Sequence, residues 1–583
     1  MRLRRRRIGV YICHCGSNIA GTVDVKDVRA YAESLPNVIV ARDYPYLCSE
    51  QGQELIKNDI LDLKLDAVVV AACSPRMHEH TFRRAIRDAG MNPYCMEQAN
   101  IREQCSWVHT DGATAKAKEI VRSAVFRVAL LEPLEEKEVS VLPSALVLGG
   151  GIAGIQAALD IANAGFKVYL VEKEPSIGGH MAQLDKTFPT LDCSACILTP
   201  KMSEIEHHEN IELLTYSEVE SVEGFVGNFK VKVRRKARLI DEEKCTGCGL
   251  CAEACRLSGK IPDEFNAGMK KRGAIYIPFP QAVPSVYVID ADNCLMITKG
   301  KCGKRPRCVE VCPTNAIDFS QKDEIIEISV GTIVVATGFD VYKPHDYGYG
   351  KFKEVITSLE LERLMNASGP TGGKIIVNGR EPKRVVFISC VGSRSEERPY
   401  CSRICCMYIM KQAHLIKEKI PDADITVLYT DVRAYGKGYE EFYEGVRSEV
   451  SYVRRELDEP IEVIKQNGSL VVRAVCEGKR REFPADIVVL ATAVVPREDA
   501  ISLARMLKIT QSADKFFLEA HPKLRPVETL TEGIFIAGCC QSPKDIPDTV
   551  AQASAAASMA CSLLTKEYLE IEPIVAVVDE RKC

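Results

Sequence analysis

The cysteines are the residues of this sequence whose type and spacing most clearly predict chemistry. The chain contains 25 of them among 583 residues, and many fall in short clusters. Many cysteines in a secreted protein suggest disulfides, but the apolar run after the basic "MRLRRRR" is too short for a signal-peptide core or a membrane span. We therefore expect a cytoplasmic protein whose thiols are reduced and serve metal binding or catalysis.

Eight cysteines within residues 237–320 have spacing typical of two [4Fe-4S] clusters. The first four follow C-x2-C-x2-C-x3-C, the pattern of bacterial two-cluster ferredoxins, and the second four follow the looser C-x7-C-x5-C-x3-C-P. One compact loop can direct three thiolates at a cubane, whereas the fourth iron must be reached from elsewhere. The expected ligand sets are crossed: Cys245, Cys248, Cys251 and Cys312 for one cluster, and Cys294, Cys302, Cys308 and Cys255 for the other. Structural zinc also uses four cysteines, but it does not account for two crossed sets.

Two shorter cysteine motifs could share a further cluster. "TLDCSACILTPKM" supplies Cys193 and Cys196, and "RPYCSRICCMY" supplies Cys401, Cys405 and Cys406, of which we place Cys401 and Cys405 in the ligand set. We favour one cluster that is shared between the two groups. The alternatives are a redox-active dithiol formed by Cys193 and Cys196, and inert core cysteines.

The N-terminal region of the chain contains five more candidate ligands. They lie at or near the ends of predicted strands such as "RIGVYICHCG" and "LDAVVVAACSPRMHE", and the carboxyl ends of strands are where α/β domains present ligands. The set consists of Cys13, Cys15, Cys48, Cys73 and Cys105. Four of the five would suffice for one more [4Fe-4S] cluster, and buried thiols without a metal are the alternative.

A strand, a glycine-rich turn, a helix, a second strand and an acidic residue follow one another in "SALVLGGGIAGIQAALDIANAGFKVYLVEKE". This order is typical of a dinucleotide-binding βαβ unit. Its glycines allow a tight turn, close approach of a pyrophosphate and helix–strand packing, and Glu172 is placed to accept hydrogen bonds from a ribose. The predicted contacts are Gly149, Gly150, Gly151, Ile152, Ala153, Gly154, Glu172, Lys173 and Gly179.

Two later segments indicate which dinucleotide is bound. "TIVVATGFD" (332–340) and "EGIFIAGCCQSPKDIPDTVAQASAAASMA" (532–560) resemble the FAD-contacting segments of two-dinucleotide-domain flavoproteins, a family that includes thioredoxin reductase. The resemblance implies FAD and adds Gly338 and Gly538 to its site. Cys539 stands where that family commonly has an aspartate.

These elements together predict an α/β fold: a two-dinucleotide-domain, thioredoxin reductase-like flavoprotein with an N-terminal α/β domain and an inserted two-cluster ferredoxin-like domain. The expected divisions are an N-terminal α/β iron–sulfur domain with a linker helix (1–140), a first FAD-binding segment (141–236), the ferredoxin-like insertion (237–320), a second FAD-binding segment (321–380), a second nucleotide-like domain (381–495), a third FAD-binding segment (496–575) and a stub of a C-terminal ferredoxin unit (576–583). The second nucleotide-like domain has "SCVGS" in place of a three-glycine turn, so we expect no nicotinamide site there. The net charge is −4 with mixed signs, which gives no indication of a nucleic-acid partner.

Several motifs distributed over the chain occur together, including "YICHCGSNIAGTVDV", "NIREQCSWVH", "CTGCGLCAEAC", "YCSRICCMY" and "PKDIPDTVAQASAAA". As a set they resemble the flavin and iron–sulfur subunit, termed A, of the heterodisulfide reductases of methanogenic archaea, over essentially the whole chain. The resemblance implies a FAD and [4Fe-4S] electron-transfer subunit that performs electron bifurcation. An electron pair from a hydrogenase or formate dehydrogenase would be divided between ferredoxin and the disulfide-reducing B and C subunits. It also implies an oligomeric complex, with no nucleic acid and no membrane span in this chain.

Two other functions stay open at this point. One is a NAD(P)H-dependent disulfide reductase that uses Cys193 and Cys196, and the other is a relay subunit of a quinone-interacting membrane complex. In full-length family members the tail continues into another ferredoxin unit, whereas "VVDERKC" ends here at Cys583 and resembles the phrases before Cys245 and Cys294. We therefore expect Cys583 to be the first ligand of an incomplete unit. Either the chain is C-terminally shortened and a separate protein supplies those clusters, or the sequence is itself incomplete, which we favour slightly.

Overall fold

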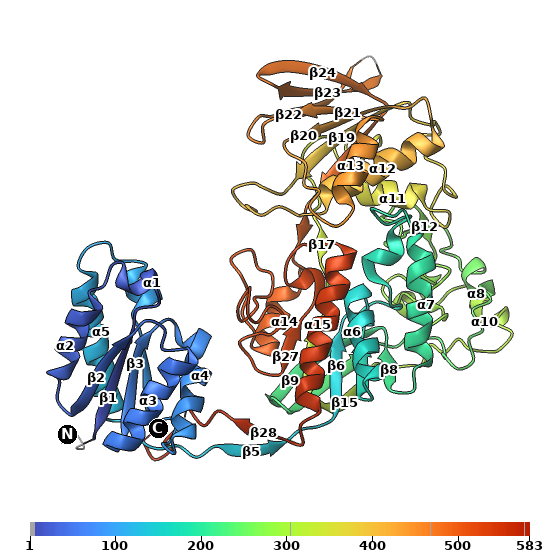
Figure 1. Cartoon of the computed structure of the whole chain (residues 1–583). Coiled ribbons are helices and arrows are strands. Elements are labelled where there is room, and N and C mark those ends of the chain that lie inside the picture. The colour runs from blue at the N-terminus through green and yellow to red at the C-terminus, as the bar shows by residue number, and fades with distance from the viewer. Residues whose placement is uncertain (1–5, 304, 467, 577, 583) are drawn as a thin grey trace. The chain divides into compact units, whose positions relative to one another are not determined.

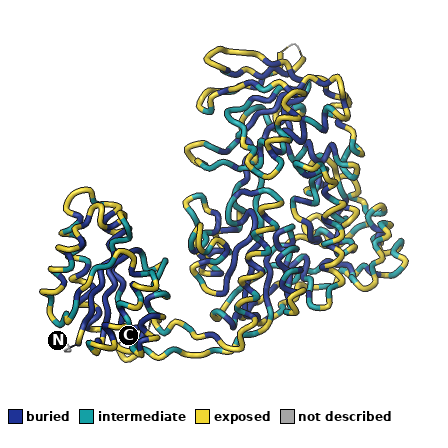
Figure 2. The backbone as a smooth tube through the Cα atoms, viewed as in Figure 1, coloured by how far each residue is buried: buried dark blue, intermediate teal, exposed yellow. Residues whose placement is uncertain are grey.

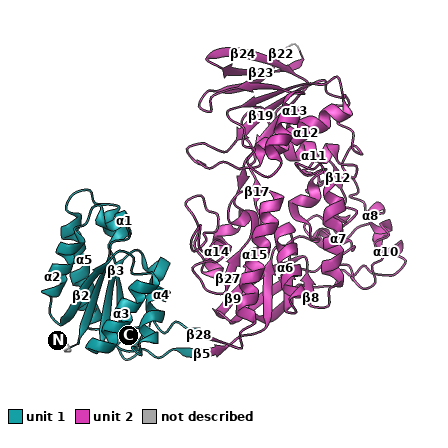
Figure 3. Ribbon diagram, in the orientation of Figure 1, with its two compact units in different colours: residues 1–138, 570–583 teal, residues 139–569 magenta. Residues whose placement is uncertain are grey.

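The computed structural model describes residues 6–303, 305–466, 468–576 and 578–582. The chain forms two compact units, Met1–Glu138 with Glu570–Cys583, and Val139–Leu569 (Figure 3). The chain passes between them at β5 (Lys137–Ser140) and β28 (Tyr568–Ile571). No helix in the described ranges is long and apolar enough to cross a membrane. Cys583 lies outside those ranges, so the ligand expected there stays a prediction.

The N-terminal unit contains a four-stranded parallel sheet in the order β2-β1-β3-β4 (Figure 1). The central strands β1 (Ile8–Cys13) and β3 (Ala67–Ala72) are buried along their whole length, as their unbroken apolar sequences predict. The outer strands are β2 (Val38–Tyr44) and β4 (Met96–Asn100). The helices are α1 (Ser17–Ala20), α2 (Val25–Glu33), α3 (Glu50–Leu63), α4 (Pro75–Asp88) and α5 (Ala113–Val128), with a π-helix at Arg102–Ser106. Because α2 packs against α5 and α3 against α4, two helical layers enclose the sheet.

The second unit contains two parallel five-stranded sheets. The first has the order β27-β16-β6-β7-β8 and is assembled from segments far apart in the sequence. Its strands are β6 (Ser144–Leu148), β7 (Lys167–Val171), β8 (Ile211–Leu214), β16 (Thr332–Val335) and β27 (Ile534–Ile536). The associated helices are α6 (Ile152–Asn163), α7 (Ser194–His207), α14 (Ala500–Leu507) and α15 (Ile546–Leu564). Antiparallel strands β9 (Ser217–Phe225), β10 (Asn228–Arg235) and β15 (Glu324–Val330) form a smaller sheet beside it.

The other five-stranded sheet has the order β18-β25-β19-β20-β21. Its strands are β18 (Val355–Thr357), β19 (Arg384–Val391), β20 (Asp424–Tyr429), β21 (Ser451–Arg454) and β25 (Ile487–Thr492). The helices are α11 (Ser358–Met365), α12 (Cys405–Lys419) and α13 (Tyr439–Arg447), and the added meander is β22 (Ile461–Gln466), β23 (Ser469–Cys476) and β24 (Lys479–Ala485). β17 (Asp340–Val341) pairs with β26 (Val494–Val495) where the chain passes between the two sheets. The two nucleotide-type sheets confirm the predicted α/β fold.

The segment between β10 and β15 contains only short elements. They are α8 (Leu250–Glu253), α9 (Leu295–Lys299), α10 (Arg307–Glu310), β11 (Ile261–Pro262), β12 (Lys271–Arg272), β13 (Ile275–Tyr276) and β14 (Val288–Ile289). Its core is smaller than the cores of the sheets, which Figure 2 shows as runs of buried backbone. Here Cys251, Cys294 and Cys308 are themselves core residues, packed with Ile240 and Ile289. A segment this small has little apolar area of its own, so cysteine side chains occupy the place of a larger hydrophobic core.

Candidate functional site

A cavity of about 930 Å³ opens at the carboxyl ends of β6, β7 and β16. This edge of a parallel sheet is where α/β proteins bind nucleotides. Most of the predicted dinucleotide contacts line the cavity, namely Gly149, Gly151, Ile152, Ala153, Glu172, Lys173, Gly179 and Gly338. Gly150, Gly154 and Gly538 support the wall from behind and are not among its lining residues.

The glycine turn after β6 has the roles that its sequence predicts. Gly149 has a φ of +104°, and a side chain there would collide with the Ala336 carbonyl oxygen. At Gly154 a Cβ atom would lie 1.8 Å from the Gly149 carbonyl oxygen, so only glycine lets α6 pack this closely. Nothing lies within 4 Å of the position of a Cβ atom at Gly151, so the backbone there is open to a ligand.

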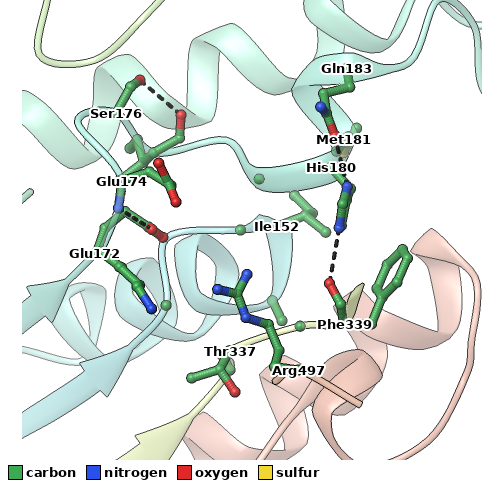
Figure 4. Close-up of a pocket in the computed structure, with 18 of the residues that line it drawn as sticks. Ile152, Glu172, Glu174, Ser176, His180, Met181, Gln183, Thr337, Phe339 and Arg497 are labelled. Carbon is green, nitrogen blue, oxygen red and sulfur yellow. Dashed lines mark hydrogen bonds between the residues drawn. The ribbon is translucent and has the colours of Figure 1, made fainter. Parts of the chain in front are cut away.

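Glu172 closes the turn from the end of β7. Its carboxylate accepts hydrogen bonds from the Gly150 N–H at 2.5 Å and from the Glu174 N–H at 2.8 Å, the second of which is drawn in Figure 4. Burial raises the pKa of Glu172, and the two N–H donors partly oppose that rise. A carboxylate oxygen can accept more than one hydrogen bond, so Glu172 can still receive a ribose hydroxyl.

The middle of the cavity is bordered by an aromatic and a cationic side chain. The His180 ring stacks on Phe339 with 4.3 Å between ring centroids, and its two nitrogens are engaged by Gln183 and the Phe339 carbonyl oxygen. Figure 4 shows the Arg497 guanidinium directed into the space between Glu172 and Ile152. Because Arg497 also pairs with Asp340 at 3.8 Å and Asp499 at 3.7 Å, it brings a partly balanced positive charge to this part of the cavity.

Two lysines of the cavity wall were missed by sequence reasoning. Lys411 and Glu362 form a buried ion pair with 2.5 Å between Nζ and Oε1, and Lys411 also donates to the Lys186 carbonyl oxygen. Lys544 is buried and donates to the Gly538 carbonyl oxygen at 2.8 Å. No local signal could have found Lys411, because α12 reads as an ordinary apolar helix and only tertiary packing places its side chain at the cavity.

Cys539, which stands where the sequence resemblance led us to expect an aspartate, also lines the cavity. Its thiol donates to the Lys544 carbonyl oxygen at 3.3 Å. Burial lowers the pKa of Lys544 and raises the pKa of Cys539, so this wall combines a neutral thiol with a desolvated amine. Cys539, in place of the expected aspartate, is thus accompanied by Lys544, which sequence reasoning did not assign to the site.

The eight cysteines of the insertion gather in the two crossed sets that their spacing predicts. The thiol of Cys251 interacts electrostatically with Cys245, Cys248 and Cys312, and these four residues line one small cavity. The thiol of Cys308 interacts in the same way with Cys255, Cys294 and Cys302. Burial raises the pKa of the Cys251 thiol to about 12 and that of the Cys308 thiol to about 11. Each set therefore brings four sulfur donors together. Cys251, Cys294 and Cys308 are buried, Cys248 is exposed, and the other four are half-buried.

One sulfur of the first set, that of Cys312, is already close to hydrogen-bond donors. The Ala316 N–H donates to Cys312 Sγ at 3.3 Å, and the Thr314 hydroxyl lies 3.7 Å from the same sulfur. Although burial raises the pKa of Cys312, these donors lower it below its ordinary value. Donors of this kind stabilise thiolate, which is the form that binds iron.

Within the described ranges, no three His, Cys, Asp or Glu side chains converge tightly enough to hold one metal ion. A cubane cluster requires a different arrangement, because each thiolate binds a different iron at its own corner of the cube. The donor sets of the insertion contain sulfur alone, without imidazole or carboxylate. Their composition and their crossed connectivity therefore fit [4Fe-4S] clusters.

Cys193 and Cys196 are joined by a disulfide at the start of α7. This arrangement corresponds to the redox-active dithiol that the sequence left as an alternative. A cluster shared with Cys401 and Cys405 would require that bond to be broken, and it stays a prediction. The Cys196 N–H donates to Cys193 Sγ at 3.3 Å, so the helix N-terminus favours negative charge on Cys193 once the bond is reduced.

Cys401 and Cys405 lie instead with Cys406, the third cysteine of their motif, and with Cys390, which sequence reasoning did not propose as a ligand. The thiols of Cys390 and Cys406 interact electrostatically with each other and with Cys401 and Cys405. Burial raises the pKa of the Cys406 thiol to about 11. A partial signal for Cys390 was present, since it lies near the end of the mostly apolar strand β19, as Cys13 lies at the end of β1.

Four of the five predicted N-terminal cysteines gather at the carboxyl ends of β1 and β3. Burial raises the pKa of the Cys73 thiol to about 12, and the nearby Cys13 and Cys15 raise it further. Cys15 and Cys48 act on Cys13 in the same way. Cys105 is placed differently, because its buried thiol donates to the Ala113 carbonyl oxygen at the start of α5.

Two family models match parts of the chain that contribute to these sites. A model for FAD dependent oxidoreductases matches residues 145–221, and a model for the 4Fe-4S binding domain matches residues 239–256. The A subunit of the "H(2):CoB-CoM heterodisulfide,ferredoxin reductase" of Methanothermobacter marburgensis is 55% identical over 592 residues, which cover 99% of this chain and 88% of that protein. A corresponding iron–sulfur A subunit of the "CoB--CoM heterodisulfide reductase" of Methanopyrus kandleri is 56% identical with the same coverage. Among solved structures, the thioredoxin reductase of T. acidophilum is 13% identical over 72% of this chain and 99% of its own, with a TM-score of 0.40.

Proposed function

Because the chain belongs to the family of heterodisulfide reductase A subunits, we propose that it divides electron pairs within a heterodisulfide reductase-type complex. It is an oxidoreductase subunit with an FAD-dependent domain and a 4Fe-4S domain. In the proposed reaction an electron pair enters from a hydrogenase or a formate dehydrogenase, and one electron leaves toward ferredoxin while the other leaves toward the B and C subunits. Two such events deliver the two electrons that, with two protons, reduce the CoB-CoM heterodisulfide to two thiols.

One observation carries this proposal: the cavity at the glycine turn is also walled by the insertion. Gly149 and Glu172 line it from the first sheet, whereas Phe265 and Asn293 line it from the insertion. Asn293 directly precedes Cys294, a member of the second crossed cysteine set. A flavin in this cavity would therefore lie beside a candidate cluster, as a branched electron path requires.

The residues of the cavity fit FAD from one end to the other. Glu172 would accept hydrogen bonds from the ribose, and the open backbone at Gly151 with the N-terminus of α6 would face the pyrophosphate. Lys411 would hold a proton at Nζ on the cavity wall, fixed there by Glu362. FAD, when bound, supplies the conversion between two-electron and one-electron transfer.

We further assign four cysteine sets to [4Fe-4S] clusters. Two are the crossed sets of the insertion. The other two are the N-terminal set, defined as Cys13, Cys15, Cys48 and Cys73, and the α12 set, defined as Cys390, Cys401, Cys405 and Cys406. Each set offers the four thiolates that such a cluster needs.

The complex proposed here is cytoplasmic and oligomeric. Its protein partners are ferredoxin, a hydrogenase or formate dehydrogenase, and the B and C subunits. The names of the relatives support hydrogen, ferredoxin and the heterodisulfide as reactants.

Coupling between the two electron acceptors tests the proposal. The complex would be purified from its source without oxygen and supplied with hydrogen or formate. We expect ferredoxin to be reduced only while heterodisulfide is present, in about equal electron amounts. Ferredoxin reduction that continues unchanged without the disulfide would contradict bifurcation.

The Cys193–Cys196 disulfide favours a second candidate, a NAD(P)H-dependent disulfide reductase. Against it, the Tyr342 ring lies directly on Gly392 in the turn where a nicotinamide dinucleotide would be expected. Mixing the FAD-loaded chain with NADPH decides between the two. Rapid flavin reduction that is followed by loss of the disulfide would favour the reductase, and an unchanged flavin spectrum would exclude it.

A further inference from the structure

Arg102 lies at the start of the π-helix that follows β4. The Asn100 side chain holds this start, because its Oδ1 accepts the N–H groups of Arg102 at 3.2 Å and Glu103 at 3.0 Å. Arg102 is only 9% exposed. Short π-helical turns are frequent at functional sites, where they direct a side chain that an α-helix would turn away.

The guanidinium of Arg102 is directed at the N-terminal set. Its Nη1 donates to Cys15 Sγ at 3.2 Å, and its Nη2 lies 2.8 Å from Met77 Sδ. It also acts electrostatically on Cys48 and Cys73, where it opposes the rise in thiol pKa that burial causes. A single buried cation therefore influences three of the four candidate ligands.

The remaining contacts of Arg102 keep it in this orientation. Glu103 Oε1 accepts hydrogen bonds from Nη2 at 2.7 Å and Nε at 3.2 Å, and the guanidinium lies 4.7 Å from the centre of the Trp107 ring. A buried arginine needs such partners, because an unpaired charge in a protein interior is costly. The negative charge of Glu103 also partly balances the positive charge of Arg102, and so limits the positive electrostatic potential that Arg102 produces at the cysteine sulfurs.

Hydrogen bonds and positive charge near cluster sulfurs favour the more negative, reduced cluster and so raise its reduction potential. We propose that Arg102 is a positioning residue that sets the reduction potential of a cluster held by the N-terminal set, through its hydrogen bond to Cys15. The inference rests on the proposed function, which assigns a [4Fe-4S] cluster to these cysteines. The step concerned adds one electron from another carrier of the complex to the cluster, and no covalent bond forms or breaks.

The test is a redox titration of the full chain, reconstituted with iron, sulfide and FAD and followed by electron paramagnetic resonance. The C15S/C73S variant identifies which signal belongs to the N-terminal set, since it should lose that signal and about four irons. We expect R102M to keep its iron and to lower the midpoint potential of the N-terminal cluster by about 59 mV, which is about a tenfold change in the one-electron equilibrium constant. E103Q should shift the same midpoint upward, and the signals of the other clusters should not move.

The outcomes separate the inference from the assignment beneath it. If C15S/C73S removes neither a signal nor iron, the assignment of a cluster to the N-terminal set is wrong, and the proposed role of Arg102 is then wrong as well. If the signal is assigned but neither R102M nor E103Q moves its midpoint, only the role of Arg102 is overturned. If R102M loses the iron of this set, the E103Q variant alone tests the proposal, because it keeps the arginine. An unchanged midpoint of the N-terminal cluster in E103Q would then contradict the proposal.

Discussion

At the scale of single residues, Glu172 illustrates how sequence and structure complement each other. Its position at the end of the second strand of a βαβ unit predicts a ribose contact, and the structure fixes its carboxylate with two backbone donors. The sequence could predict this residue because the motif is local and contiguous. It could not predict Lys411 or Lys544, whose places on the same cavity depend on helices and loops that fold in from later in the chain.

Replacing Glu172 tests its role in binding FAD. We expect E172A to weaken FAD binding by roughly tenfold to a hundredfold, since a hydrogen bond to a charged group contributes about 1.5–3 kcal/mol. Fluorescence titration of the flavin-free protein measures the affinity. E212Q is a suitable control, because Glu212 forms a partly exposed ion pair with Lys167 outside the cavity. An unchanged affinity in E172A would exclude the ribose contact.

The same carboxyl group predicts how FAD binding depends on pH. Burial raises the pKa of Glu172 above its ordinary value of 4.5, so it becomes protonated at a higher pH than an exposed glutamate. The protonated form is a weaker acceptor, and FAD affinity should therefore fall as pH decreases toward this raised pKa. In E172Q the affinity should be lower but nearly constant over that range. A wild-type affinity that stays flat there would contradict the assignment.

The Lys411–Glu362 pair predicts a large effect on stability. Because both side chains are almost fully buried, K411M leaves the Glu362 carboxylate without its cation, which should cost about 3–5 kcal/mol in unfolding free energy. The double variant K411M/E362L should recover much of that loss, since an apolar pair of similar volume tolerates burial. Denaturant unfolding of the flavin-free chain provides the comparison. Equal stability of K411M and the wild type would show that the pair is not coupled.

At the scale of elements, the insertion depends on its cysteines for its core. Spacing alone predicted the crossed sets, because a tight loop can supply only three ligands to one cube. The α12 set was not predicted in full, because Cys390 comes from β19. Cys401 precedes α12, Cys405 and Cys406 begin it, and only the packing of that helix on the sheet brings them to Cys390. Local spacing is informative when ligands share a loop, and it fails when they come from separate elements.

Removing one insertion ligand should therefore affect folding as well as iron content. We expect C251A to lose about four irons and to expose residues 237–320 to hydrogen exchange, because metal binding and folding are coupled in such small segments. C476A is a matched control, since Cys476 is also buried but lies in the meander of the second sheet. Full protection of the insertion in C251A would show that its fold does not depend on the cluster.

At the scale of the whole chain, one cavity connects the segments of the second unit. Its wall includes residues of the first sheet, of the insertion and of α12, among them Glu172, Asn293 and Lys411. A flavin held there would lie where a two-electron donor and one-electron carriers can both reach it. The parallel sheets and the glycine turn were predictable from local patterns, but the convergence of three segments on one cavity was not, because it arises from contacts distant in sequence.

The content of FAD and iron per chain tests the central claim most directly. The account predicts one FAD and about sixteen irons in the anaerobically reconstituted full chain, because four cysteine sets each hold one [4Fe-4S] cluster. A chain that binds no FAD would contradict the account. So would a chain that saturates at about eight irons, because only the insertion would then be loaded.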